Sequence, residues 1–174
     1  MNYILINFIL FLITTSNLLA DPPTPFPSIP CKRSDYKGFV YETQIGSEKV
    51  RLPFAVFLPK DYEVDKNRKW PMIVFLHGAE EIGTDLQTCF VHGFHKEFDN
   101  SPEMVKNFPF IILLPQTNIG GDPKKNNGVY NGWEDTMSHA VVSLIKILPD
   151  YSCVDHNKLS STGCSLGRSG VWEV

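Results

Sequence analysis

The stretch 161-STGCSLGRSGVWEV-174 decides the fold, because it places a lone serine between two glycines. Gly163 and Gly167 flank Ser165, each at a spacing of two residues. A sharp turn from a strand into a helix needs residues without side-chain bulk at those positions, and it lifts the serine hydroxyl above the sheet. A serine must be exposed in this way, with a base nearby, before it can attack a carbonyl. Ser165 is therefore a candidate catalytic nucleophile.

A second glycine turn, His77-Gly78-Ala79, follows an apolar run. Where two such turns meet at one edge of a sheet, backbone amides can hold the oxyanion that forms when a serine attacks. We expect the amide of Leu166 to be one of the two donors, and the amide of Ala79 or Gly78 to be the other. The other residues expected to line this site are His77, Glu80 and Arg168.

Hydrophobic patterning predicts the strands before the elbow. Residues 39–45 and 51–58 alternate loosely between apolar and polar and are separated by turn residues, which predicts an antiparallel hairpin. The runs 72-MIVFLHG-78 and 110-FIILLPQ-116 are continuously apolar up to their last residues, as strands covered on both faces are. A crossover helix over 86–98 would join them as a parallel pair.

A second helix is expected from Met137, because apolar residues recur there at spacings of three and four until Pro149 ends the pattern. A long loop over 118–133 precedes it, and a short strand over 159–162 leads into the elbow. The order hairpin, strand, helix, strand, helix, strand predicts an α/β fold. The sheet is expected to be mostly parallel, with an N-terminal antiparallel hairpin and flanking helices.

Length and charge limit the class of protein. The chain has 174 residues, 43% of them hydrophobic, which suits one domain. A net charge of −3 provides no surplus of basic residues for binding nucleic acid, so we expect no nucleic-acid partner.

Residues 1–20 resemble a signal peptide that is too short for a stable membrane span, so we expect secretion. A proline-rich leader over 21–35 and a folded domain over 36–174 follow.

The cysteines suit an exported protein. Four are present, which allows two disulfides in three alternative pairings. Cys164 is the one least expected to take part. The Cys and His spacings match no zinc site, so we expect no metal, and no cofactor is implied.

Several stretches together carry a family resemblance: 52-LPFAVFLPKDYEVDKNRKWPMIVFLHGAEEIGTD-85, 110-FIILLPQ-116 and 154-VDHNKLSSTGCSLGRSGVWEV-174. They resemble the amino-terminal half of secreted α/β-hydrolase esterases, often labelled predicted peptidases. These are similar to phospholipase/carboxylesterases and to polyhydroxybutyrate-depolymerase-like and feruloyl-esterase-like enzymes. The resemblance implies a serine hydrolase of small or polymeric carboxylic esters, and it leaves open whether peptides are cleaved as well. It also implies that Trp133 and Trp172 pack near the site.

The chain departs from this family at three places. Arg168 and Glu80 stand where the family usually has glycine, and a carboxylate beside the oxyanion pocket would oppose developing negative charge. The third departure concerns the acid and the histidine, which follow the nucleophile in this superfamily. No histidine follows Ser165 in this sequence. We therefore expect this 174-residue chain to be nearly inactive, with a truncated gene model as the reason for its length.

The upstream histidines are weak candidates for the missing base. His77 is expected to order the oxyanion turn, and His92, His95 and His139 to lie on solvated helix surfaces. His156 is expected at the opposite end of the sheet. A rival hypothesis is a non-catalytic secreted binding protein built on a hydrolase half-domain. In either case the last strand would leave one edge unpaired, through which we expect self-association.

Overall fold

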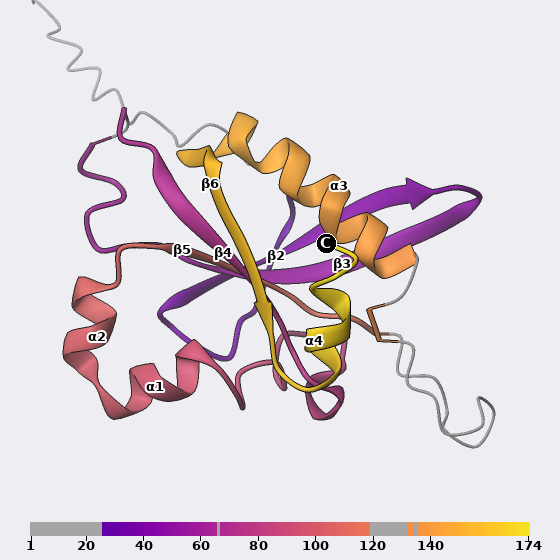
Figure 1. The fold of residues 1–174 in the computed structure, drawn as a ribbon, viewed down its shortest axis with the longest axis horizontal. Helices are drawn as coiled ribbons and strands as arrows, with labels where there is room; N and C mark the ends of the chain where they lie inside the picture. Colours follow the sequence, from indigo (N-terminus) through magenta and orange to yellow (C-terminus); the bar gives the residue numbers. More distant parts are fainter. Residues whose placement is uncertain (1–25, 66, 119–131, 134–135) are drawn as a thin grey trace, which may run out of the picture.

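The computed structural model describes residues 26–65, 67–118, 132–133 and 136–174. The signal peptide expected at residues 1–20 lies outside the described residues, as do the first part of the leader and most of the loop expected over 118–133. Six strands form one sheet in the order β1-β2-β3-β5-β4-β6, and helices lie against it (Figure 1). The chain therefore has the α/β fold expected from its patterning.

The first strands form the expected hairpin. β2 (Tyr36–Ile45) and β3 (Glu48–Phe57) pair antiparallel along their whole length. Gly46 has φ 59° in the turn between them, a left-handed conformation that glycine adopts at little cost. A short strand, β1 (Ser28–Ile29), pairs with β2 inside the stretch expected to be a leader. Ordered structure therefore begins before the expected start at Tyr36.

The middle of the sheet is parallel, and the candidate site lies there. β4 (Trp70–Leu76) pairs in parallel with β5 (Ile111–Pro115) on one side and with β6 (Val154–Gly163) on the other. β5 also joins the hairpin through an antiparallel pairing with β3. β6 is longer than the strand expected over 159–162, because its pairing with β4 begins at Val154 and resumes after a bulge.

The sheet has a hydrophobic core on each face, and β5 contributes to both. Ile111 and Leu113 belong to the core on one face, and Ile112 and Leu114 to the core on the other. All four are at most 2% exposed. This explains why the strand reads as a continuous apolar run: neither of its faces meets water.

Helix α3 (Thr136–Tyr151) covers one of these faces, crossing the sheet near β2 and β3 (Figure 1). The apolar stripe expected from Met137 is buried against it. The expected end at Pro149 was wrong, since the helix continues to Tyr151 with Pro149 inside its last turn. A proline there sacrifices only one backbone hydrogen bond, and its ring is buried.

The helix expected over 86–98 was also wrong in its first half. Residues 82–93 form a loop, α1 (Phe94–Asn100) begins only after Gly93, and α2 (Pro102–Asn107) follows. Gly93 has φ 91°, and a Cβ on it would collide with the Phe75 ring, so both the backbone and the space require glycine there. Together the loop and these helices cover the second face of the sheet (Figure 1).

The described cysteines form no disulfide. Cys153 and Cys164 adjoin opposite ends of β6, whereas Cys31 and Cys89 belong to the same hydrophobic core. Among the described residues, no helix is long and apolar enough to cross a bilayer.

Candidate active site

The backbone at Ser165 has an unusual conformation. Ser165 lies between β6 and the short helix α4 (Leu166–Gly170), with φ 51° and ψ −112°. It is exposed, and besides Leu86 it is the only described non-glycine residue with positive φ. Such a conformation costs on the order of 1–3 kcal/mol and persists only where the surroundings enforce it. The turn therefore presents the serine at the carboxyl end of a parallel strand.

The glycines around Ser165 provide the space that the turn needs. A Cβ on Gly163 would lie 2.5 Å from the carbonyl oxygen of Gly167, and a Cβ on Gly167 would collide with the carbonyl oxygen of Leu76. A Cβ on Gly170 would lie 2.5 Å from the Cβ of Trp133. The helix after the serine is thus pressed directly against the end of β4, and only glycine permits that approach.

The second glycine turn lies beside the first. A Cβ on Gly78 would be 3.5 Å from the carbonyl oxygen of Cys164 and 3.6 Å from the Cβ of Ser165. β4 and β6 end next to each other, since the amide of Cys164 donates to the carbonyl of Leu76 at 3.1 Å. The fold thus brings together the two turns that the sequence pattern singled out separately.

The two amides proposed in this turn differ in availability. The Gly78 amide donates to Oε2 of Glu81 at 3.0 Å, so the expectation that Gly78 could serve as an oxyanion donor needs correction. Among the described residues, no acceptor takes the amide of Ala79 or that of Leu166. These two amides lie on the adjoining turns and remain the candidate oxyanion donors.

His77 is a structural residue of this turn. Its side chain is fully buried, and its Nε2 accepts the amide of Thr117 at 3.1 Å. The ring proton therefore resides on Nδ1, which donates to the carbonyl of Gly78 at 2.7 Å. Burial lowers the pKa of His77, which keeps the ring neutral. With both nitrogens engaged, His77 orders the loop, as its place in the sequence indicated.

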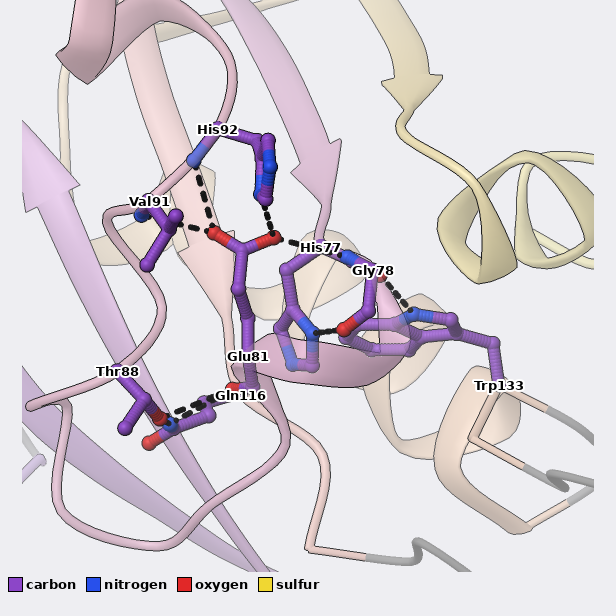
Figure 2. A network of polar contacts seen from close by, with 8 residues as sticks. All are labelled: His77, Gly78, Glu81, Thr88, Val91, His92, Gln116 and Trp133. Atoms are coloured by element: carbon purple, nitrogen blue, oxygen red, sulfur yellow. Dashed lines mark hydrogen bonds and ion pairs between the residues drawn. The ribbon is translucent and has the colours of Figure 1, made fainter.

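Trp133 supports the same turn from the other side. Its Nε1 donates to the carbonyl of His77 at 2.9 Å, and the two rings meet edge to face with centroids 4.9 Å apart (Figure 2). Trp133 is 1% exposed, which fits a packing role. Trp172 was expected to pack nearby and does not, since it is 88% exposed.

Glu81 is the residue of this site that the sequence analysis passed over. Glu80 and Arg168, which were expected to line the site, both have exposed side chains, whereas the Glu81 side chain is fully buried. The Glu81 carboxylate lies between the oxyanion turn and the loop that carries His92 (Figure 2). The step from Glu80 to Glu81 in the short 3₁₀ helix η1 (Ala79–Glu81) turns one carboxylate outward and the next inward.

The buried side-chain amide of Gln116, the residue after β5, holds the same loop. Gln116 Nε2 donates to the carbonyl of Glu81 at 3.0 Å and to Oγ1 of Thr88 at 2.9 Å. Its Oε1 accepts the amide of Leu86 at 2.8 Å. Gln116 is fully buried, so its hydrogen bonds replace water for loop groups that would otherwise be unsatisfied.

The remaining histidines lie apart from any catalytic arrangement with Ser165. His139 is exposed on α3, as expected, and His156 lies near the start of β6, at the opposite end of that strand from Ser165. The expectation for His92 was wrong, because it lies in the loop before α1 and not on a helix. The expectation for His95 was wrong, because it is 1% exposed and its ring meets those of Tyr36, Phe75 and Phe90 edge to face. Burial lowers its pKa to about 4.

Known structures resemble this fold. The chain is 26% identical to a thermostable esterase, with a TM-score of 0.52 over 80% of this chain and 36% of that one. It is 21% identical to a ferulic acid esterase, with a TM-score of 0.50 over 79% of this chain and 53% of that one. The chain therefore spans about a third to a half of the length of these proteins. No protein-family model matches the sequence, and the search of curated proteins finds no match.

Proposed function

We propose that this chain, which belongs to the α/β-hydrolase superfamily, carries the nucleophile and the oxyanion hole of a serine hydrolase that cleaves carboxylic esters. The observation that carries the proposal is the backbone of Ser165, whose positive φ is enforced by the close approach of Gly167 to the end of β4. A strained, exposed serine at the carboxyl end of a parallel strand serves no packing purpose. It suits attack on a carbonyl above the sheet.

In the proposed mechanism, Oγ of Ser165 bonds to the ester carbonyl carbon while its proton passes to a base. The carbonyl π electrons move onto oxygen, where the amides of Leu166 and Ala79 stabilise the negative charge. Collapse of this intermediate breaks the bond to the alcohol, which leaves with the proton from the base. Water then attacks the acyl-enzyme by the same route and releases the acid.

The base and the acid of the triad are proposed to come from outside these 174 residues. His77 is tied by both ring nitrogens and His95 is buried among aromatic rings, so neither is free to accept a proton from Ser165. Loss of the triad partners costs several orders of magnitude in rate. These 174 residues alone are therefore proposed to be nearly inactive.

We further propose that the protein acts outside the cell, on the basis of the predicted signal peptide at residues 1–20. β6 pairs with β4 on one side and with no described strand on the other. An open strand edge is a template for pairing, so self-association through β6 is proposed for the 174-residue chain.

A fluorophosphonate probe tests the nucleophile in the protein expressed from its complete coding sequence. The wild type is expected to be labelled, and Ser165→Ala to lose labelling. Ser169→Ala is the matched control, because Ser169 is an exposed serine on the same short helix and should leave labelling unchanged. Labelling that persists in Ser165→Ala refutes the assignment. Absence of labelling in a folded wild type favours the rival hypothesis of a binding protein, which the exposed Glu80 and Arg168 beside the turns support.

A further inference from the structure

We propose that Glu81 is the positioning residue of the oxyanion hole: it holds the Gly78–Ala79 turn against the loop at Val91 and His92, so that the amide of Ala79 is left for the substrate. The inference rests on the proposed function and deepens it. No motif in the sequence assigns this role to Glu81. It follows from the contacts of one fully buried carboxylate.

Both oxygens of that carboxylate accept hydrogen bonds. Oε2 accepts the amide of Gly78 at 3.0 Å, and Oε1 accepts the amides of Val91 and His92 at 3.0 and 3.1 Å. Nδ1 of His92 lies 3.5 Å from Oε2, with the His92 side chain 39% exposed (Figure 2). A carboxylate buried without partners would be costly, so these donors must stay in place for the chain to fold around it.

These bonds determine which amide faces the substrate. The side chain of Glu81 reaches back to the amide of Gly78, while the amide of Glu81 donates to the carbonyl of Gly78 at 3.2 Å. This reciprocal pair closes the turn and fixes the peptide planes within it. The next amide along, that of Ala79, is the one left without a described acceptor. An oxyanion hole acts only when its donors are fixed before reaction. By fixing the turn that carries the Ala79 amide, Glu81 contributes directly to the rate.

The charge of Glu81 is also accounted for by the same contacts. A carboxylate close to a developing oxyanion opposes it. Here three amide dipoles point at the carboxylate, and the imidazole of His92 lies beside it on the exposed side. The carboxylate therefore holds the turn in place, while the dipoles of the groups that donate to it offset most of its negative charge.

The test compares Glu81→Gln with Glu97→Gln in the complete enzyme, assayed with p-nitrophenyl acetate. A glutamine has one acceptor oxygen, so its NH₂ group must face at least one of the amides that now donate to Glu81. We expect kcat per probe-titrated site to fall by about 10- to 100-fold, with KM within about twofold. Glu97→Gln removes the same charge from an exposed position on α1, outside both turns, and should stay within about twofold of wild type.

A second readout separates positioning from mere folding. Phenylboronic acid forms a tetrahedral adduct with a serine nucleophile, and one of its oxygens occupies the oxyanion hole. Its inhibition constant should rise in Glu81→Gln by about the same factor as kcat falls, and stay constant in Glu97→Gln. If Glu81→Gln does not fold, Glu81→Asp is used instead. It keeps the charge, but one fewer methylene prevents it from reaching Gly78 and the 91–92 loop together, so the same two changes are expected.

Three outcomes overturn the inference or its basis. If Glu81→Gln or Glu81→Asp folds and matches Glu97→Gln in kcat and in boronate inhibition, Glu81 does not position the hole. If His92→Gln, which keeps the backbone amide, loses as much activity as Glu81→Gln, the imidazole and not the backbone bonds carries the effect. Persistence of labelling in Ser165→Ala instead removes the proposed function itself, and that result is independent of both Glu81 variants.

Discussion

Acidification should destabilise this protein through His95, and the size of the effect follows from its surroundings. His95 is 1% exposed, and neither of its ring nitrogens has a hydrogen-bond partner among the described residues. Burial lowers its pKa from 6.5 to about 4, with the nearby Glu81 acting in the opposite direction and Arg33 adding to the decrease. The folded protein therefore keeps this ring neutral at pH values where the unfolded chain protonates it.

The direction of the pH effect is determined by this difference. Because the folded-state pKa of His95 is depressed, its stabilising contribution is complete above pH 6.5 and is lost as the pH falls from there to about 4. A pKa difference of one corresponds to about 1.4 kcal/mol, so the full loss is about 3.5 kcal/mol, of which about 3 kcal/mol has been lost at pH 4. Burial lowers the pKa of His77 as well, so that residue adds a loss of the same sign.

His95→Phe isolates the contribution of His95 from that of His77 and of the carboxylates. Phenylalanine is similar in size, and the site is already lined by the rings of Tyr36, Phe75 and Phe90. At pH 7.5 the variant should be at least as stable as wild type, because it removes two buried nitrogens without partners. Between pH 7.5 and 4 it should lose about 3 kcal/mol less than wild type.

Urea unfolding followed by circular dichroism, at intervals across this pH range, measures the difference. His139→Phe is the control, since His139 is exposed on α3 and should follow the wild-type pH dependence. If the unfolding free energies of wild type and His95→Phe fall in parallel with pH, then His95 does not titrate as its burial implies, and the argument fails.

Three further substitutions test the packing around the site. Gly167→Ala places a methyl group into the carbonyl of Leu76 and should abolish probe labelling of the elbow, whereas Gly46→Ala, whose Cβ meets open space, should keep it. Labelling of Gly167→Ala at the wild-type rate would contradict the proposed geometry. Gln116→Met leaves its loop partners unsatisfied and should lower the free energy of unfolding by about 2 kcal/mol in urea titrations; no measurable loss would mean that water replaces the amide. Trp133→Phe removes one hydrogen bond to the oxyanion turn and should cost about 1 kcal/mol by thermal unfolding, with an unchanged melting temperature as the contrary result.

Part of the fold could be predicted because its signals are local. Ser165 could be placed on a strained turn because glycines at 163 and 167 indicate that the backbone around it is too crowded for side chains. The apolar runs indicated strands buried on both faces, and β4 and β5 are indeed parallel neighbours. Each of these inferences uses residues a few positions apart, where the geometry of the chain leaves few alternatives.

Other features are determined only when distant segments meet. The sequence has two adjacent glutamates at 80 and 81, and nothing in their order tells which one turns inward. Glu81 is buried because Val91 and His92, ten and eleven residues later, bring their amides to it. Likewise, a loop replaces the first half of the helix expected over 86–98, where Gln116, the residue after β5, accepts the amide of Leu86 and donates to the carbonyl of Glu81 just before the loop. The spacing of apolar residues within a short segment indicates whether that segment forms a helix or a strand. The free-energy cost of burying a polar group depends instead on hydrogen-bond partners that only the tertiary structure supplies.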